Sequence, residues 1–235
     1  LMRDDPSPIF GFLRQPTLSD FPGRVAAVFF VSGCNLSCRF CHNPELMGSL
    51  RPGLPWRRIE EACCAFRENW VTGVVLTGGE PTLVPRLEDL IAFFRRFGFA
   101  VKVDTNGARP DVVELLSGWA DCVAMDVKAP PALYPTLTGW KDVDAIGRSI
   151  EAVRRMGDRG ILRTTILDPE HTDEAMRQIG EWIQGAAHYR IQPFVPRPDL
   201  PDPAFRNRPR TSARRMEEVR EIVRPFVREV VIEGE

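Results

Sequence analysis

The 235-residue chain carries 31 basic and 32 acidic side chains, and its formal net charge is −1. This balance gives no electrostatic reason to expect nucleic acid as a partner. Hydrophobic residues make up 43% of the chain, enough for a packed core, and the length suits one domain. The longest apolar run, residues 25–31, is far shorter than the roughly 20 residues that cross a bilayer, so we expect no membrane partner.

The first residues, Leu-Met-Arg-Asp-Asp-Pro, lack the charged and then apolar layout of a signal peptide. We therefore expect a cytoplasmic, reducing location. In such a compartment the six cysteines are expected to be metal ligands or core thiols rather than disulfides.

Short β-branched and apolar runs alternate with helical patterns along the chain. Residues 86–97 are typical of the helices, because Leu87, Leu90 and Phe94 recur at helical spacing and Gly98 ends the pattern. Strands are predicted at residues 25–31, 73–76, 100–104, 122–127, 160–166, 189–194 and 226–232. Helices are predicted at residues 56–69, 86–97, 111–118, 144–156, 172–184 and 212–223.

The alternation of strand and helix predicts an α/β fold with parallel strands and right-handed crossovers. Six such units and a last strand are too few for a closed eight-stranded barrel of ~250 residues. We therefore expect an incomplete, laterally open (β/α)6 TIM-like barrel with its core at about residues 17–195. The rest, 196–235, is expected to pack on the barrel. Its mixed charges indicate a solvated covering helix, and a docking surface for a large partner is the alternative.

Four chemically unusual segments each follow one of the first four predicted strands. In parallel α/β folds, ligands bind at the carboxyl ends of strands, because the loops there are free to vary. The sequence therefore predicts one site built from all four segments. They are Cys34–Cys41, Gly78–Pro81, Asp104–Gly107 and Asp126–Lys128.

The first segment places three thiols, Cys34, Cys38 and Cys41, within eight residues. Thiolates are soft ligands for iron, and a tight loop can wrap a single cluster. Three protein ligands for four irons leave one iron open to a substrate or cofactor. The pattern therefore favours a [4Fe–4S] cluster.

Three other interpretations of this loop stay open. Cys38-Arg-Phe-Cys41-His42 also fits haem attachment, although no export signal is visible. The three cysteines with His42 could hold zinc, but adjacent Cys41 and His42 would strain to face one metal. Inert thiols rarely cluster in a loop rich in Gly, Asn and Pro. We expect small buried residues at the remaining cysteines, Cys63, Cys64 and Cys122.

The cysteine spacing, with the aromatic Phe40 before the last thiol, resembles the signature of the radical S-adenosylmethionine superfamily. Gly78-Gly79-Glu80-Pro81 is similar to that superfamily's methionine-binding segment. The resemblance covers about residues 17–195. Four segments resemble the glycyl-radical-enzyme activating enzymes, above all those of anaerobic ribonucleoside-triphosphate reductase: Asp20–Gly23, Cys41–Pro44, Asp104–Gly107 and Met125–Lys128.

The resemblance implies an oxidoreductase in which S-adenosylmethionine binds the open iron and is reductively cleaved to a 5′-deoxyadenosyl radical. A flavodoxin- or ferredoxin-type donor would supply the electron. The radical would abstract a Cα hydrogen from a glycine of a partner glycyl radical enzyme, expected to be the anaerobic ribonucleotide reductase. The protein would orient the cofactor and exclude water and oxygen.

The resemblance also assigns residues to the cofactor. Glycine would let backbone groups approach the methionine amine, and Glu80 would face the ligand or fix the loop. Asp104, Thr105 and Asp126 match a monovalent-cation site, for which hard oxygen ligands are suited. An Asn-Gly turn by itself would also explain Asp104–Gly107. The residues expected to bind the cofactor are Phe40, Gly78, Gly79, Glu80, Asp104, Lys128 and Arg163.

One segment, Ile191–Arg197, departs from the activating enzymes. Val195 stands where some of them place a histidine, so Gln192 is only a candidate contact for adenine or ribose. No proton transfer is assigned to His42 or His171.

Two rival functions are kept. One is a radical enzyme acting on a small heterocycle, as in queuosine synthesis, or on a peptide. The other is a non-catalytic iron–sulfur or zinc-binding module. The hypothesis of such a module does not explain three segments: Gly78–Pro81, Asp104–Gly107 and Asp126–Lys128.

Overall fold

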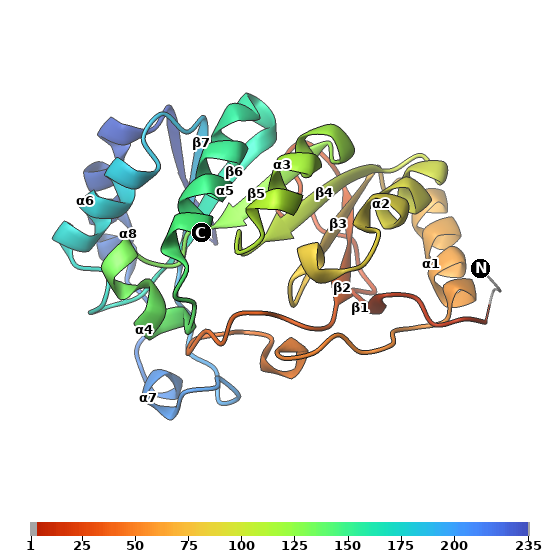
Figure 1. Ribbon diagram of the computed structural model, residues 1–235, viewed down its shortest axis with the longest axis horizontal. Coiled ribbons are helices and arrows are strands. Elements are labelled where there is room, and N and C mark those ends of the chain that lie inside the picture. The colour runs from red at the N-terminus through yellow and green to blue at the C-terminus, as the bar shows by residue number, and fades with distance from the viewer. Residues whose placement is uncertain (1–3, 235) are drawn as a thin grey trace. The chain divides into compact units, whose positions relative to one another are not determined.

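The computed structural model describes residues 4–234, in which eight strands form one sheet in chain order (Figure 1). This order has two ends, so the sheet is open, and the expected open α/β architecture is confirmed. The strands are β1 (Ile9–Phe12), β2 (Ala26–Val31), β3 (Gly73–Gly78), β4 (Ala100–Thr105), β5 (Cys122–Asp126), β6 (Gly160–Ile166), β7 (His188–Pro193) and β8 (Glu229–Ile232).

All six predicted helices are present, and two short helices were not predicted. The α-helices are α1 (Trp56–Glu68), α2 (Leu87–Arg96), α3 (Pro110–Trp119), α4 (Tyr134–Thr138), α5 (Val143–Arg155), α6 (Asp173–Trp182), α7 (Pro203–Arg206) and α8 (Ala213–Val223). Single 3-10 turns lie at Pro44–Leu46, Pro81–Leu83, Pro131–Leu133, Gly157–Arg159 and Arg224–Phe226. No helix of the described chain is long and apolar enough to span a membrane.

The described residues form two compact units, and the prediction of a single domain stays a prediction. The first unit contains the residues up to 35, 45–105 and 118–123. The second contains 36–44, 106–117 and the residues from 124 onward. The chain thus passes between the units within the loop that follows β2, here called the cysteine loop and defined as residues 32–44.

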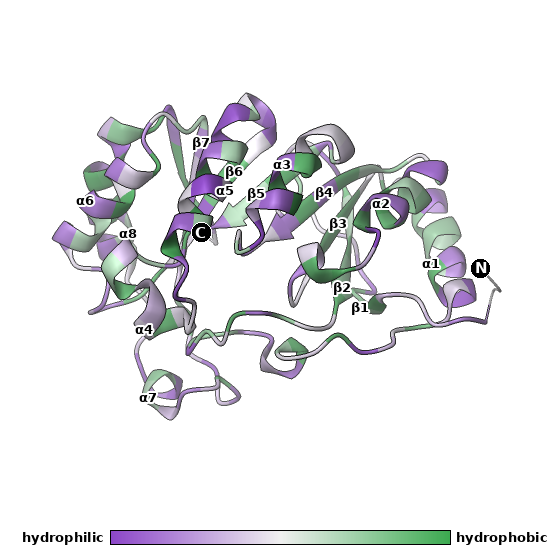
Figure 2. Ribbon diagram, in the orientation of Figure 1, coloured by the Kyte–Doolittle hydropathy of each residue, from purple (hydrophilic) through white to green (hydrophobic). Residues whose placement is uncertain are grey.

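In the first unit, β2, β3 and β4 are parallel, and β1 adds an antiparallel edge that the sequence did not predict. Strands β2 and β3 are largely apolar, as expected for parallel strands covered by helices (Figure 2), whereas β4 carries Lys102 and Asp104. Phe29 of β2 packs on Phe94 of α2 at 4.7 Å and on Phe66 of α1 at 6.0 Å between ring centroids. This core holds the carboxyl ends of β2, β3 and β4 side by side.

In the second unit, β6, β7 and β8 are parallel, and the C-terminal helix α8 packs on α6 and β7. Met216, Val219 and Val223 form its buried face, as expected for a covering helix. Arg163 of β6 stands beside Arg190 of β7 in the parallel register. Residues paired in a parallel register point to the same face of the sheet, so Arg163 and Arg190 lie on one face.

Candidate functional site

The three predicted cluster ligands all lie in the cysteine loop. Cys34 belongs to the first unit, where its N–H donates to the Gly48 carbonyl over 2.8 Å. Cys38 and Cys41 belong to the second unit, and Cys38 is buried. None of the three forms a disulfide within residues 4–234. Three thiols on one eight-residue stretch are a donor set that fits an iron–sulfur cluster.

The second-unit part of the cysteine loop is bound along its backbone to the end of α4. Ser37 N–H donates to the Thr138 carbonyl over 2.8 Å, and Arg39 N–H donates to the Leu137 carbonyl over 3.0 Å. A Cβ on Gly139, which has φ of +72°, would lie 2.2 Å from the Ser37 hydroxyl. The short helix α4, absent from the prediction, therefore supports the loop beside Cys38.

Gly78, the last residue of β3, and Gly79 pack against the backbone at the end of β2, just before Cys34. Gly79 N–H donates to the Val31 carbonyl over 2.9 Å, and Glu80 N–H donates to the Gly33 carbonyl over 2.7 Å. A Cβ on Gly78 would lie 2.5 Å from the Val31 oxygen, and one on Gly79 would lie 2.0 Å from the Gly33 oxygen. Close packing of two backbone segments therefore requires glycine here, a reason that the sequence did not reveal.

Glu80 is fully buried at the start of the turn after β3. Its Oε1 accepts hydrogen bonds from the Thr82 N–H at 3.0 Å, the Thr82 hydroxyl at 2.6 Å and the Thr105 hydroxyl at 2.7 Å. A carboxylate that accepts several hydrogen bonds is held firmly in place. The contacts favour the loop-fixing role of Glu80, and they tie the ends of β3 and β4 together.

Asp104 has a partner that the sequence analysis missed. Lys102 lies two residues earlier on β4 and forms an ion pair with Asp104, and the two side chains are only 4% and 8% exposed. Residues two apart on a strand share a face, so the period-two spacing was a signal for this pair. The negative charge of Asp104 is balanced by an ammonium group of the chain itself.

Asp126 lies between two cations in the second unit. Its Oδ1 accepts from Arg163 Nε at 2.6 Å, and its Oδ2 accepts from Lys128 Nζ at 2.7 Å. Burial would raise the pKa of Asp126, but the charges and hydrogen bonds of Arg163 and Lys128 outweigh it and hold that pKa below its usual range. The three predicted residues Asp126, Lys128 and Arg163 are thus brought together.

Lys128 also links this cluster to the cysteine loop. Burial would lower the pKa of the Lys128 ammonium, but Asp126 and then Cys38 raise it above its usual range. Lys128 therefore interacts electrostatically with Cys38 of the cysteine loop. This interaction connects two of the four predicted segments within one unit.

His171 is a structural histidine in this neighbourhood. Its Nδ1 accepts from the Leu167 N–H at 3.1 Å, so its Nε2 carries the proton and donates to the Lys128 carbonyl at 3.1 Å. Its side chain is fully buried, and burial lowers its pKa from 6.5 to about 4. His171 therefore stays neutral and fixes the backbone of Lys128.

This arrangement predicts a loss of stability in mild acid. Between pH 6.5 and about 4 the unfolded chain binds a proton at His171 and the folded chain does not. The free energy of unfolding should therefore fall as the pH drops through this window, by up to about 3 kcal/mol. Urea titrations at several pH values measure this change in the free energy of unfolding. His171→Gln should be less stable at pH 7.5 and show a flatter dependence, and an unchanged slope would contradict the assignment.

Gln192, the candidate contact for adenine or ribose, is engaged by the end of the chain. Its Nε2 donates to Glu233 Oε2 at 2.5 Å, and Arg190 forms an ion pair with the same carboxylate. The neighbouring Val195 is exposed, and its carbonyl accepts a hydrogen bond from His42 Nε2 at 3.0 Å. The structure thus gives His42 a backbone contact.

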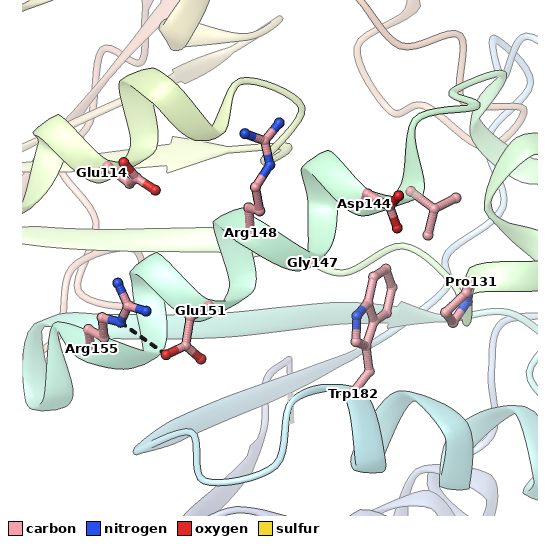
Figure 3. Close-up of a pocket in the computed structure, with 9 residues that line it drawn as sticks. Glu114, Pro131, Asp144, Gly147, Arg148, Glu151, Arg155 and Trp182 are labelled. Carbon is pink, nitrogen blue, oxygen red and sulfur yellow. Dashed lines mark hydrogen bonds and ion pairs between the residues drawn. The ribbon is translucent and has the colours of Figure 1, made fainter.

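A groove of about 530 Å³ lies on the helix side of the second unit (Figure 3). Trp182 of α6 stands against α5, where a Cβ on Gly147 would lie 3.5 Å from the indole nitrogen. Negatively charged carboxylates and positively charged guanidinium groups line the rest of the groove. Among them, Arg155 is paired with Glu151. None of the predicted site residues lines it, so this groove is separate from the predicted chemistry.

A family model described as the radical SAM superfamily matches residues 28–183. The chain belongs to this superfamily. It is therefore a radical SAM oxidoreductase, and membership implies a [4Fe–4S] cluster and S-adenosylmethionine. The cysteine loop fits the cluster through its three thiols.

Several relatives of this radical SAM enzyme are activating enzymes by name. It is 29% identical over 221 residues to "Putative glycyl-radical enzyme activating enzyme MJ1227" of Methanocaldococcus jannaschii. This match covers 91% of this chain and 90% of that protein. It is also 29% identical to the pyruvate formate-lyase-activating enzyme of Clostridium pasteurianum, over 76% of this chain and 77% of that enzyme. These matches confirm the resemblance to the activating enzymes.

Another relative has a different activity. The 7-carboxy-7-deazaguanine synthase of Methanopyrus kandleri is 29% identical over 71% of this chain and 73% of that enzyme. Among solved structures, TYW1 with a lysine-pyruvate adduct matches with a TM-score of 0.67 at 16% identity, over 92% of this chain and 80% of that chain. At this identity the match concerns the fold alone, and it agrees with an open radical SAM barrel.

Proposed function

We propose that this radical SAM enzyme is a glycyl-radical activase. It would abstract the Cα hydrogen of one glycine in a partner glycyl radical enzyme, with an anaerobic ribonucleoside-triphosphate reductase as the first candidate. The observation that carries the proposal is the similarity to the Methanocaldococcus jannaschii protein along nine-tenths of both chains. The pyruvate formate-lyase-activating relative supports the same reaction class.

In this proposal the cluster and S-adenosylmethionine supply the 5′-deoxyadenosyl radical, and the chain holds and orients them. Cys34, Cys38 and Cys41 would ligate the cluster. Two groups of residues would hold S-adenosylmethionine around it. The turn fixed by Glu80 would present backbone groups to the amine, and Lys128 and Arg163 would provide positive charge for the carboxylate. The complete set proposed for this cofactor is Phe40, Gly78, Gly79, Glu80, Asp104, Lys128 and Arg163.

The monovalent cation expected on Asp104, Thr105 and Asp126 stays a prediction, and it would compete with cations of the chain itself. Lys102 forms an ion pair with Asp104, and Lys128 and Arg163 hold Asp126 from both of its oxygens. Each carboxylate is therefore balanced by cations of the chain. Burying a further positive charge beside these groups would add a desolvation penalty and little compensating attraction.

The proposal also includes a flavodoxin- or ferredoxin-type electron donor and a reducing cytoplasmic location. Both follow from the chemistry, because a cluster with an open iron needs a low-potential electron and is easily oxidised. A second candidate function is carried by the Methanopyrus kandleri relative. In that case the radical would act on a small heterocyclic substrate rather than on a protein.

Electron paramagnetic resonance distinguishes these two candidates. The reduced enzyme is mixed with S-adenosylmethionine and the anaerobic ribonucleotide reductase of the same organism. We expect a glycyl radical on the reductase and one 5′-deoxyadenosine released per radical. A reductase whose radical glycine is replaced by alanine is the control and should show no signal. Release of 5′-deoxyadenosine without any radical on the reductase would contradict this partner and favour the heterocyclic substrate.

A further inference from the structure

A proline-rich loop of the second unit lies directly on the cysteine loop. It comprises residues 194–211, here called the clasp, and contains the short helix α7 (Figure 1). The sequence predicts no helix between residues 194 and 212. Its two ends meet, because Thr211 N–H donates to the Phe194 carbonyl and Phe194 N–H donates to the Thr211 hydroxyl, both over 3.0 Å. The clasp is therefore a compact loop closed at its base.

Phe205 of α7 is the centre of the contact between the two loops. It is fully buried, and its ring centroid lies 6.1 Å from that of Phe40 and 6.0 Å from that of Phe194. The guanidinium groups of Arg39 and Arg208 lie over the same ring at 5.3 and 3.7 Å. Cation–π and aromatic contacts of this kind stabilise a loop beyond the burial of its apolar area.

Polar contacts join the same two loops on either side of Phe205. Arg39 Nε donates to Asp202 Oδ2 at 2.5 Å, and the Asp202 N–H donates to the Arg39 carbonyl at 3.2 Å. Further along, Arg197 donates to the His42 carbonyl at 2.9 Å, and His42 Nε2 donates to the Val195 carbonyl at 3.0 Å. The clasp thus binds the residues on both sides of Cys41.

The clasp is itself fastened to the rest of the second unit. Arg208 donates two hydrogen bonds to the carboxylate of Glu170, at 2.5 and 2.7 Å, and a third to the Asp168 carbonyl at 3.2 Å. Asp202 Oδ1 caps α7 by accepting from the Ala204 N–H at 2.8 Å. Prolines lower the entropy lost when such a loop is ordered. The clasp can therefore hold the cysteine loop in one conformation.

We infer that the clasp positions Cys38 and Cys41 for the cluster, with Phe205 as the positioning residue. This inference rests on the proposed cluster site. The end of α4 supports one part of the cysteine loop through Ser37 and Arg39, and the clasp covers it from Arg39 to His42. With both supports in place Cys38 and Phe40 are only 8% and 5% exposed. The clasp also limits access of water, chelators and oxygen to the cluster.

Two pairs of variants test the clasp in the full-length protein. Phe205→Ala removes the central ring, and Phe205→Leu restores apolar volume as the conservative rescue. Asp202→Asn keeps the cap of α7, since asparagine caps well, but loses the ion pair with Arg39. Asp89→Asn is its matched control, because Asp89 forms an exposed ion pair with Arg86 at the start of α2, outside both the clasp and the cysteine loop.

Hydrogen exchange of the chain without cluster is the first measurement. We expect the amides of residues 39–42 to exchange about tenfold faster or more in Phe205→Ala, with Phe205→Leu in between. The second measurement is the rate at which a chelator removes the reconstituted cluster, followed by the paramagnetic resonance spectrum of the reduced cluster. The removal rate should rise by about the same factor, and the spectrum should change.

The inference is overturned if residues 195–210 exchange faster in Phe205→Ala while residues 39–42, cluster removal and spectrum match the wild type. If Phe205→Ala does not fold, the comparison of Asp202→Asn with Asp89→Asn decides. Faster cluster removal in Asp202→Asn alone supports the clasp, and equal rates in both contradict it. A wild-type chain that takes up no cluster would instead refute the proposed function, since exchange of residues 39–42 is measured without iron.

Discussion

Replacement of Cys38 by alanine is expected to prevent assembly of the four-iron cluster and to lower 5′-deoxyadenosine release more than about 100-fold. Loss of a group that merely orients a metal ligand already costs up to about 100-fold, and loss of a ligand should cost more. Cys34→Ala and Cys41→Ala should behave in the same way. Iron and sulfide content, together with product quantification after anaerobic reconstitution, measure the effect.

Cys63 and Cys64 provide the controls for this experiment. Both lie on α1, where Cys63 is buried as expected, whereas the expectation of a buried Cys64 is wrong, because its side chain is exposed. Burial, and then Cys64 and Glu60, raise the pKa of the Cys63 thiol to about 12, so it stays protonated and is a poor ligand. Cys63→Ala and Cys64→Ala should keep the full iron content. A Cys38→Ala protein with four irons and wild-type product release would refute the ligand assignment.

Gly79→Ala is expected to destabilise the chain by about 3 kcal/mol or more and to abolish binding of S-adenosylmethionine. The new methyl group would lie 2.0 Å from the Gly33 carbonyl oxygen, and overpacking against backbone costs at least as much as overpacking a core, about 1–3 kcal/mol. Thermal unfolding and equilibrium binding of S-adenosylmethionine to the reconstituted enzyme measure the two effects.

Gly11→Ala is the matched control in the same unit. Nothing lies within 4 Å of a Cβ at Gly11 on the edge strand β1. The substitution should change stability by between zero and a gain of about 1 kcal/mol, because alanine restricts the unfolded chain. If Gly79→Ala unfolds at the wild-type temperature, the packing account of the Gly78–Glu80 turn is wrong.

The sequence was most informative where a local pattern decides the structure. The helix predicted at 86–97 is α2, and the predicted strands are all present. The carboxyl-end rule correctly gathered Glu80 with Thr105 in one unit. Asp126 and Lys128 needed no such rule, because they lie two residues apart in one segment.

The sequence was least informative where distant segments decide the structure. Phe205 contacts Phe40 across 165 positions of the chain, and no sequence pattern in the proline-rich clasp indicates that contact. Helices α4 and α7 are too short, and too rich in proline, for a helical pattern. The ion pair of Lys102 with Asp104 was missed, because the two residues were not considered together although they share one face of a predicted strand.

The central claim is that the cysteine loop supports radical cleavage of S-adenosylmethionine. The most direct measurement is the amount of 5′-deoxyadenosine formed by the reduced, reconstituted wild-type enzyme under strict exclusion of oxygen. We predict release of 5′-deoxyadenosine that depends on S-adenosylmethionine, on reductant and on all three loop cysteines. A preparation with a full complement of four irons per chain that releases none would contradict the claim and leave a metal-binding module.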